Sequence, residues 1–119
     1  MKTILVVDDE LSNAEVMSLI LEEEGFRVFT AVNGRHGVER VRELSPALVL
    51  LDFMMPVMDG GQMGRALREQ ATTKHLPIVM TSSLEEDAVR EYFDGYDAFL
   101  RKPFSVDALL AVIHRLLRR

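Results

Sequence analysis

Residues 4–9 read ILVVDD, four consecutive apolar residues followed by two aspartates. Residues 48–52 read LVLLD and repeat this pattern with a single aspartate. A strand that is apolar without alternation has both of its faces covered, which is typical of the inner strands of a parallel sheet. An aspartate directly after such a strand lies at the carboxyl edge of that sheet. These two stretches therefore predict a parallel α/β fold with acidic groups gathered at one edge.

Three further β-rich runs complete a set of five, and helical periodicity fills the spaces between them. The predicted strands are residues 3–7, 27–31, 47–51, 78–81 and 98–100. The predicted helices cover about 35–44, 61–71, 85–93 and 105–118, after a first helix that Ser12 or Asn13 caps and that ends at Gly25. Strict alternation of strands and helices with right-handed crossovers gives a doubly wound sandwich. For five strands the common order is 2-1-3-4-5, which is the flavodoxin-like arrangement.

The length and composition fit one globular domain, which we expect to cover residues 1–119. Of the 119 residues, 48% are hydrophobic and 28% are charged. The apolar runs fall short of the roughly 20 residues that span a membrane, and residues 1–4 do not resemble a signal region. We therefore expect no membrane association and a cytoplasmic location. The absence of cysteine excludes disulfides and thiolate sites, and the net charge of −5 disfavours nucleic acid as a direct partner.

Polar side chains follow four of the five predicted strands. Asp8 and Asp9 follow the first, Asp52 follows the third, residues 81–83 (TSS) close the fourth, and Lys102 follows the fifth. In an open α/β sheet these positions share the crevice where the strand order reverses. Crowded carboxylates repel one another unless a divalent cation neutralises them, and Mg2+ suits such oxygen ligands. Asp52 is the natural nucleophile for phosphorus, with a lysine and a hydroxyl to hold the charge of the transferred group.

Each of these residues also has an ordinary structural explanation. Aspartates after strands often form turns, and serines often cap helices. The function is indicated by their joint placement at successive strand ends, because independent loop positions rarely combine a cation site with a counter-charge on one rim.

The motifs resemble those of the receiver domain of two-component response regulators, the CheY-like family, over essentially the whole chain. Residues 6–10 (VVDDE), 52–60 (DFMMPVMDG) and 99–104 (FLRKPF) resemble its acidic pair, its phosphoacceptor segment and its lysine-proline turn. The resemblance implies a switch that accepts a phosphoryl group from a sensor histidine kinase or a histidine phosphotransfer protein. The switch would then change conformation to control a downstream output protein or domain. Such a domain is a monomer or a weak phosphorylation-dependent dimer, and it promotes only its own phosphorylation and dephosphorylation.

The resemblance also implies which residues accept the phosphoryl group and bind the metal. Asp52 would be the phosphoacceptor. Asp9, Asp52 and the backbone carbonyl of Met54 would bind Mg2+, and Asp8 would act mainly through water.

The remaining implied residues connect the site to an output face. Ser82 is preferred to Thr81 as the switch hydroxyl, and Lys102 would pair with the phosphoryl oxygens beside a cis bond to Pro103. Phe99 would be the rotating aromatic residue that links Asp52 and Ser82 to the face formed by the fourth helix, fifth strand and fifth helix.

The sequence departs from the family pattern on that face. Ser83 stands where a small alanine is usual, and Tyr96 stands where a small residue is usual. The winged-helix transcription branch has charged residues for dimer pairs where this chain has Ala98, Ala108 and Val112. These substitutions predict an unusual output face and disfavour that dimer.

Two other functions share parts of this pattern. A Mg2+-dependent phosphohydrolase of the dehalogenase-like type also forms an aspartyl phosphate, but it typically has a second aspartate where this chain has Met54. A flavin-binding module has the same topology, but its phosphate loop is rich in glycine, serine and threonine, whereas residues 8–10 are acidic.

Overall fold

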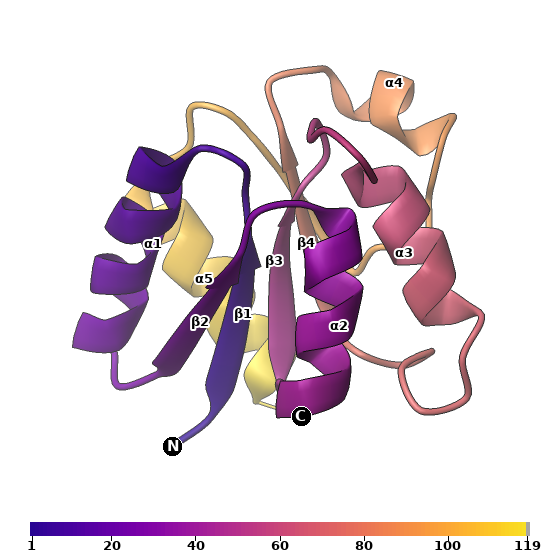
Figure 1. Ribbon diagram of the computed structural model, residues 1–119. Coiled ribbons are helices and arrows are strands. Elements are labelled where there is room, and N and C mark those ends of the chain that lie inside the picture. Colours follow the sequence, from indigo (N-terminus) through magenta and orange to yellow (C-terminus); the bar gives the residue numbers. More distant parts are fainter. Residues whose placement is uncertain (119) are drawn as a thin grey trace.

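The computed structural model describes residues 1–118, and Arg119 lies outside the described residues. Its five strands form one parallel sheet in the order β2-β1-β3-β4-β5. The strands are β1 (Thr3–Val7), β2 (Arg27–Ala31), β3 (Leu48–Asp52), β4 (Ile78–Ser82) and β5 (Ala98–Arg101). The helices are α1 (Leu11–Glu23), α2 (Gly34–Leu44), α3 (Gly60–Arg68), α4 (Glu86–Arg90) and α5 (Val106–Leu117). The predicted doubly wound fold and its strand order are confirmed (Figure 1).

The sheet lies between two layers of helices, with α1 and α5 on one face and α2, α3 and α4 on the other (Figure 1). Alternate side chains of the inner strands enter the two layers. Leu48 and Leu50 of β3 pack with α1 and α5, whereas Val49 and Leu51 pack with α2 and α3. All five residues of β3 are buried, which is why its sequence is continuously apolar up to the aspartate.

The start of α1 differs from the prediction. The helix begins at Leu11, and Glu10 is its N-cap without a capping side chain, so Ser12 and Asn13 lie inside the first turn and do not cap it. The carbonyl of Glu10 already accepts the N–H of Ala14 at 3.0 Å. The helix therefore starts almost directly after β1, which leaves only a short acidic loop between them.

Two other helices are shorter than predicted. α3 ends at Arg68 rather than near 71, and α4 ends at Arg90 rather than near 93. Phe93 leaves the line of α4 and packs its ring directly over Gly64 of α3. α1 ends at Glu23 with Glu24 as its C-cap, and the predicted stop residue Gly25 follows directly with a φ of 95°, which suits glycine. Across residues 1–118, no helix has the length and apolar character needed to cross a membrane.

Gly60 fixes the segment that follows β3. Its N–H donates to the carbonyl of Phe53 at 2.8 Å, and a Cβ at this position would lie 2.5 Å from the backbone oxygen of Asp52. Asp59 caps α3 in a capping box with Gln62. Together these contacts hold the loop of residues 53–59 against the end of β3, beside the carboxylate of Asp52.

Candidate functional site

The polar residues predicted at the strand ends meet at the carboxyl edge of the sheet. They surround a cleft of about 340 Å3 that is lined by Asp9, Glu10, Asn13, Asp52, Met54, Ser82, Ser83 and Lys102. The cleft lies where the strand order reverses, because β1 is the shared neighbour of β2 and β3. This is the usual place for a ligand in an open α/β sheet.

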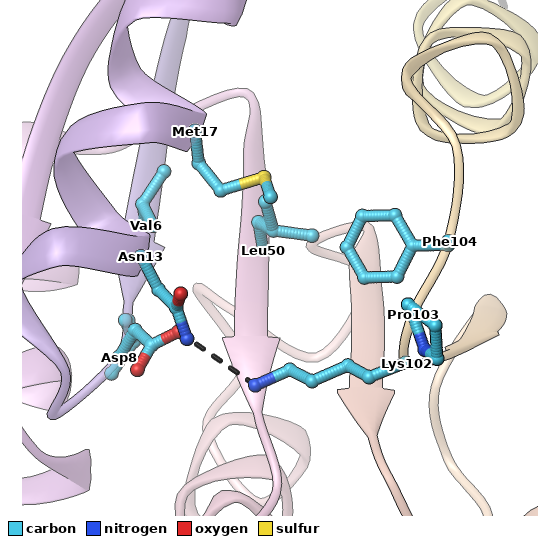
Figure 2. Close-up of a pocket in the computed structure, with 9 residues that line it drawn as sticks. Val6, Asp8, Asn13, Met17, Leu50, Lys102, Pro103 and Phe104 are labelled. Atoms are coloured by element: carbon cyan, nitrogen blue, oxygen red, sulfur yellow. Dashed lines mark ion pairs between the residues drawn. The ribbon is translucent and has the colours of Figure 1, made fainter.

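Three carboxylates and one lysine form the centre of the site. One oxygen each from Asp8, Asp9 and Asp52 lies within 4.8 Å of the others. The Nζ atom of Lys102 is 3.1 Å from Oδ1 of Asp52 and 3.9 Å from Oδ2 of Asp8. Figure 2 shows Lys102 reaching from one side of the site toward Asp8 and Asn13 on the other. Lys102 is therefore ion-paired with two of the three clustered carboxylates.

Burial makes the charge of the two inner carboxylates unfavourable. Asp8 and Asp52 are only 7% and 6% exposed. Burial raises the pKa of Asp52 from 3.8 to about 6, although the ammonium of Lys102 opposes this shift and Asp8 adds to it. Burial also raises the pKa of Asp8, against the N–H of Glu10 and the charge of Lys102. A positive charge in the cleft would relieve this penalty.

A second cavity of about 270 Å3 lies beside the carboxylates and is largely apolar. Met17, Leu50 and Phe104 form much of its lining, and Asp8 and Lys102 lie at its polar end (Figure 2). Apolar side chains thus lie beside the ion pair of Asp8 and Lys102.

The residues fit a hard divalent cation. Three carboxylates from two adjacent strand ends offer oxygen ligands of the kind that Mg2+ prefers. Asp8 keeps one oxygen engaged with the N–H of Glu10 at 2.9 Å, which orients its carboxyl group. Asp9 is exposed and completes the cluster from the solvent side.

The predicted switch residues lie on β4 and β5. Ser82 is 1% exposed, lines the cleft, and its hydroxyl oxygen accepts the N–H of Leu84 at 3.1 Å. Phe99 lies on β5 opposite Met80, on the side of the sheet that packs with α4, and outside the set of residues that line the cleft. The bond between Lys102 and Pro103 is cis, as the resemblance implies.

The sequence prediction missed the cleft position of Asn13. This residue lines both the polar cleft and the apolar cavity. It is the third residue of α1, and because helical side chains tilt toward the N-terminus of their helix, Asn13 lies beside Asp8 (Figure 2). A correct start for the helix would have placed it in the site.

Comparisons with known proteins agree with this geometry. Residues 4–114 match the response regulator receiver domain family. The chain is 36% identical over its full length to the DNA-binding dual master transcriptional regulator RpaA of Synechocystis, of which it covers 50%. The chain thus spans about half the length of the curated relatives it matches.

Solved structures with 30% and 33% sequence identity to this chain have the same fold. The receiver domain of a signal transduction histidine kinase from Syntrophus aciditrophicus has a TM-score of 0.93 at 33% identity, over 99% of this chain and 91% of that one. The response regulator TrrA of Thermotoga maritima, solved in complex with Mg2+ and BeF, has a TM-score of 0.90 at 30% identity, over 98% of this chain and 100% of that one. These matches do not favour the phosphohydrolase alternative. The chain therefore belongs to the response regulator receiver domain family, the phosphoacceptor switches of two-component signalling.

Proposed function

We propose that Asp52 accepts a phosphoryl group from a phosphohistidine of a sensor histidine kinase or a histidine phosphotransfer protein. The observation that carries this proposal is the 3.1 Å contact between Lys102 and a buried carboxylate at the centre of an acidic cluster. A carboxylate oxygen of Asp52 attacks phosphorus, the bond from phosphorus to the donor nitrogen breaks, and the imidazole keeps that electron pair. The product is an acyl phosphate on Asp52.

Bound Mg2+ would neutralise the carboxylates and stabilise charge on the transferred group. Asp9, Asp52 and the backbone carbonyl of Met54 would hold it, with Asp8 acting mainly through water. Lys102 is paired with Asp52, which supports the proposal that it would pair with the new phosphoryl oxygens. The hydroxyl of Ser82 would exchange the N–H of Leu84 for one of those oxygens, and this exchange would couple phosphorylation to the loop before α4.

The receiver domain would extend over residues 1–119 and would work in the cytoplasm, where it would control a downstream output protein or domain. We expect this chain alone to be a monomer or a weak phosphorylation-dependent dimer, and to promote no reaction beyond its own phosphorylation and dephosphorylation. We also expect no direct contact with nucleic acid. The net charge of −5 supports this, and Arg115 and Arg118 at the end of α5 match the favourable charge at a helix C-terminus.

Intact-mass analysis with a small phosphodonor tests the assignment of Asp52. Acetyl phosphate and Mg2+ should add one phosphoryl group to the wild-type chain. Addition of a chelator or the substitution Asp52→Asn should abolish the gain, whereas Asp94→Asn, an exposed control that removes the same charge, should leave it unchanged. Equal labelling of wild type and Asp52→Asn would contradict the proposal.

A further inference from the structure

Tyr96 lies in the segment between α4 and β5 and contacts both elements. Its ring lies between two aromatic rings, with centroid distances of 6.3 Å to Phe93 and 5.8 Å to Phe99. Its hydroxyl donates a hydrogen bond of 2.7 Å to Oε2 of Glu86, the first residue of α4. One side chain therefore connects α4, the approach to β5, and the aromatic residue predicted to rotate.

The acceptor of this hydrogen bond is a carboxylate held in place from both sides. The Nη2 atom of Arg90 lies 3.0 Å from the same Oε2 atom of Glu86. The hydrogen bond from Tyr96 and the neighbouring Arg90 lower the pKa of Glu86, so the group is ionised at neutral pH. Hydrogen bonds to an ionised acceptor are stronger than neutral ones.

The helix that receives this bond is short. α4 has only five residues, and among the described residues its N-cap Glu85 makes no side-chain cap. A helix of this length has little stability of its own and depends on tertiary contacts. Val89 is its buried residue, and the bond between Tyr96 and Glu86 holds its first turn. This hydrogen bond therefore helps to position α4, together with the contacts of Arg101 with the carbonyl of Ser83 and with Glu85.

The proposed phosphorylation would act on the same region. Ser82 ends β4, and its hydroxyl now accepts the N–H of Leu84 in the loop that leads into α4. If Ser82 turns to a phosphoryl oxygen on Asp52, this loop loses its hydrogen bond and α4 loses one of its anchors. The contacts of Tyr96 with Glu86 and Phe99 belong to the arrangement in which Ser82 faces Leu84.

We infer that Tyr96 is a positioning residue that holds α4 and Phe99 in the unphosphorylated arrangement and so weakens binding of a phosphoryl group at Asp52. The inference rests on the proposed function. A contact made in only one of two states shifts the equilibrium toward that state by its own free energy, and it raises the apparent dissociation constant of a ligand that prefers the other state. This role gives a reason for the tyrosine at position 96, where the resemblance implies a small residue.

Binding of beryllofluoride in the presence of Mg2+ tests the inference on the full chain. Tyr96→Phe keeps the ring and removes only the hydroxyl, and it should tighten beryllofluoride binding about threefold to tenfold. Glu86→Gln keeps an acceptor oxygen without its charge and should give a smaller gain in the same direction. Tyr92→Phe is the matched control, because it removes the hydroxyl of an exposed tyrosine nearby, and it should bind as the wild type does.

An NMR spectrum without beryllofluoride supplies a second readout. The amide signals of Leu84 and Phe99 in Tyr96→Phe should move part of the way toward their positions in the beryllofluoride complex. A purely structural role would lower the thermal stability of Tyr96→Phe and leave both the affinity and these signals unchanged, and that result would overturn the inference. If Tyr96→Phe fails to fold, unchanged affinity in Glu86→Gln overturns it instead. If the wild type and Tyr92→Phe bind no beryllofluoride, the proposed function fails and the inference fails with it.

Discussion

At the scale of the single residue, Asp52 has a conflict between burial and charge. It is 6% exposed, and burial raises its pKa from 3.8 to about 6 despite the contact with Lys102. Between these two pH values the folded chain holds a proton that the unfolded chain has released. The free energy of unfolding therefore falls as the pH rises through this range, and the loss persists at neutral pH. The proposed phosphoacceptor thus lowers the stability of the chain when no cation is bound.

The cost of that charge predicts a stabilising substitution. A shift of this size corresponds to on the order of 3 kcal/mol. In the presence of a chelator at pH 7.5, Asp52→Asn should therefore be more stable than the wild type by about 1–3 kcal/mol, and the advantage should disappear near pH 4. Urea denaturation at both pH values measures this difference, with Asp94→Asn as the control for net charge. A wild type as stable as Asp52→Asn at pH 7.5 would show that burial does not penalise this carboxylate.

Two apolar side chains near the cleft predict a long-lived phosphoryl group. Met54 and Leu84 stand two residues beyond Asp52 and Ser82, and their side chains are 58% and 38% exposed. Neither offers a strong hydrogen bond to a water molecule that attacks the acyl phosphate, and alignment of that water is a large part of the catalysis of hydrolysis. The double variant Met54→Asn with Leu84→Glu should lose its phosphoryl group about tenfold faster than the wild type.

The decay of the phosphorylated chain in Mg2+ after removal of the donor measures that lifetime. Val57→Asn is a useful control, because it places the same amide on an exposed residue of the same loop. Equal decay of the double variant and the wild type would disprove the shielding by Met54 and Leu84 and would leave Asp52 as the acceptor.

At the scale of the element, the beginning of α3 determines how the loop after Asp52 is held. Gly60→Ala would place a methyl group 2.5 Å from the backbone oxygen of Asp52 and 2.8 Å from Cα of Phe53. Neither backbone atom can move without displacing the end of β3, so the substitution should destabilise the chain by about 1–3 kcal/mol and weaken binding of Mg2+. Gly61→Ala is the matched control, because its Cβ would meet only side chains, at 3.2 Å and beyond. Similar urea midpoints for the two variants would contradict this role of Gly60.

The strands could be predicted from the sequence because their signal is local. All five observed strands end with the predicted residue or one residue beyond it. The three inner runs are buried almost throughout, and each is followed by or ends in a polar residue at the carboxyl edge of the sheet. The ends of α3 and α4 depend on contacts between distant segments and could not be predicted in this way. Phe93 turns away from α4 to cover Gly64, and the side chain of Arg68 donates to the carbonyls of Leu76 and Gly95.

The same distinction applies to the candidate site, where contacts between strand ends could be predicted and contacts between loops could not. Asp8, Asp52 and Lys102 could be predicted to meet because parallel strands bring their carboxyl ends to one edge. The hydrogen bond between Tyr96 and Glu86 could not be predicted, because it depends on the path of two loops around a helix of one turn.

At the scale of the whole molecule, the cleft and the predicted output face lie on different parts of one sheet. The three inner strands are buried almost throughout, so a change at Asp52 has little freedom to spread through them. We therefore propose that the response runs along the ends of β4 and β5 into the short α4, which lies at the same end of the molecule as the cleft (Figure 1). Ser82 and Lys102, which line the cleft, would stand at the start of this proposed route.

Substitution of either residue should therefore separate phosphorylation from the response. Ser82→Ala and Lys102→Ala should leave the fold intact, because the first removes one turn hydrogen bond and the second removes a side chain that is 28% exposed. Each loses a group that would act on the phosphoryl oxygens in the modified state alone, and such a group supplies the differential interaction that a switch requires. With Mg2+ and beryllofluoride, the NMR signals of Phe99 and α5 should shift much less in both variants than in the wild type. Full wild-type shifts in both variants would show that the response leaves the cleft by another route.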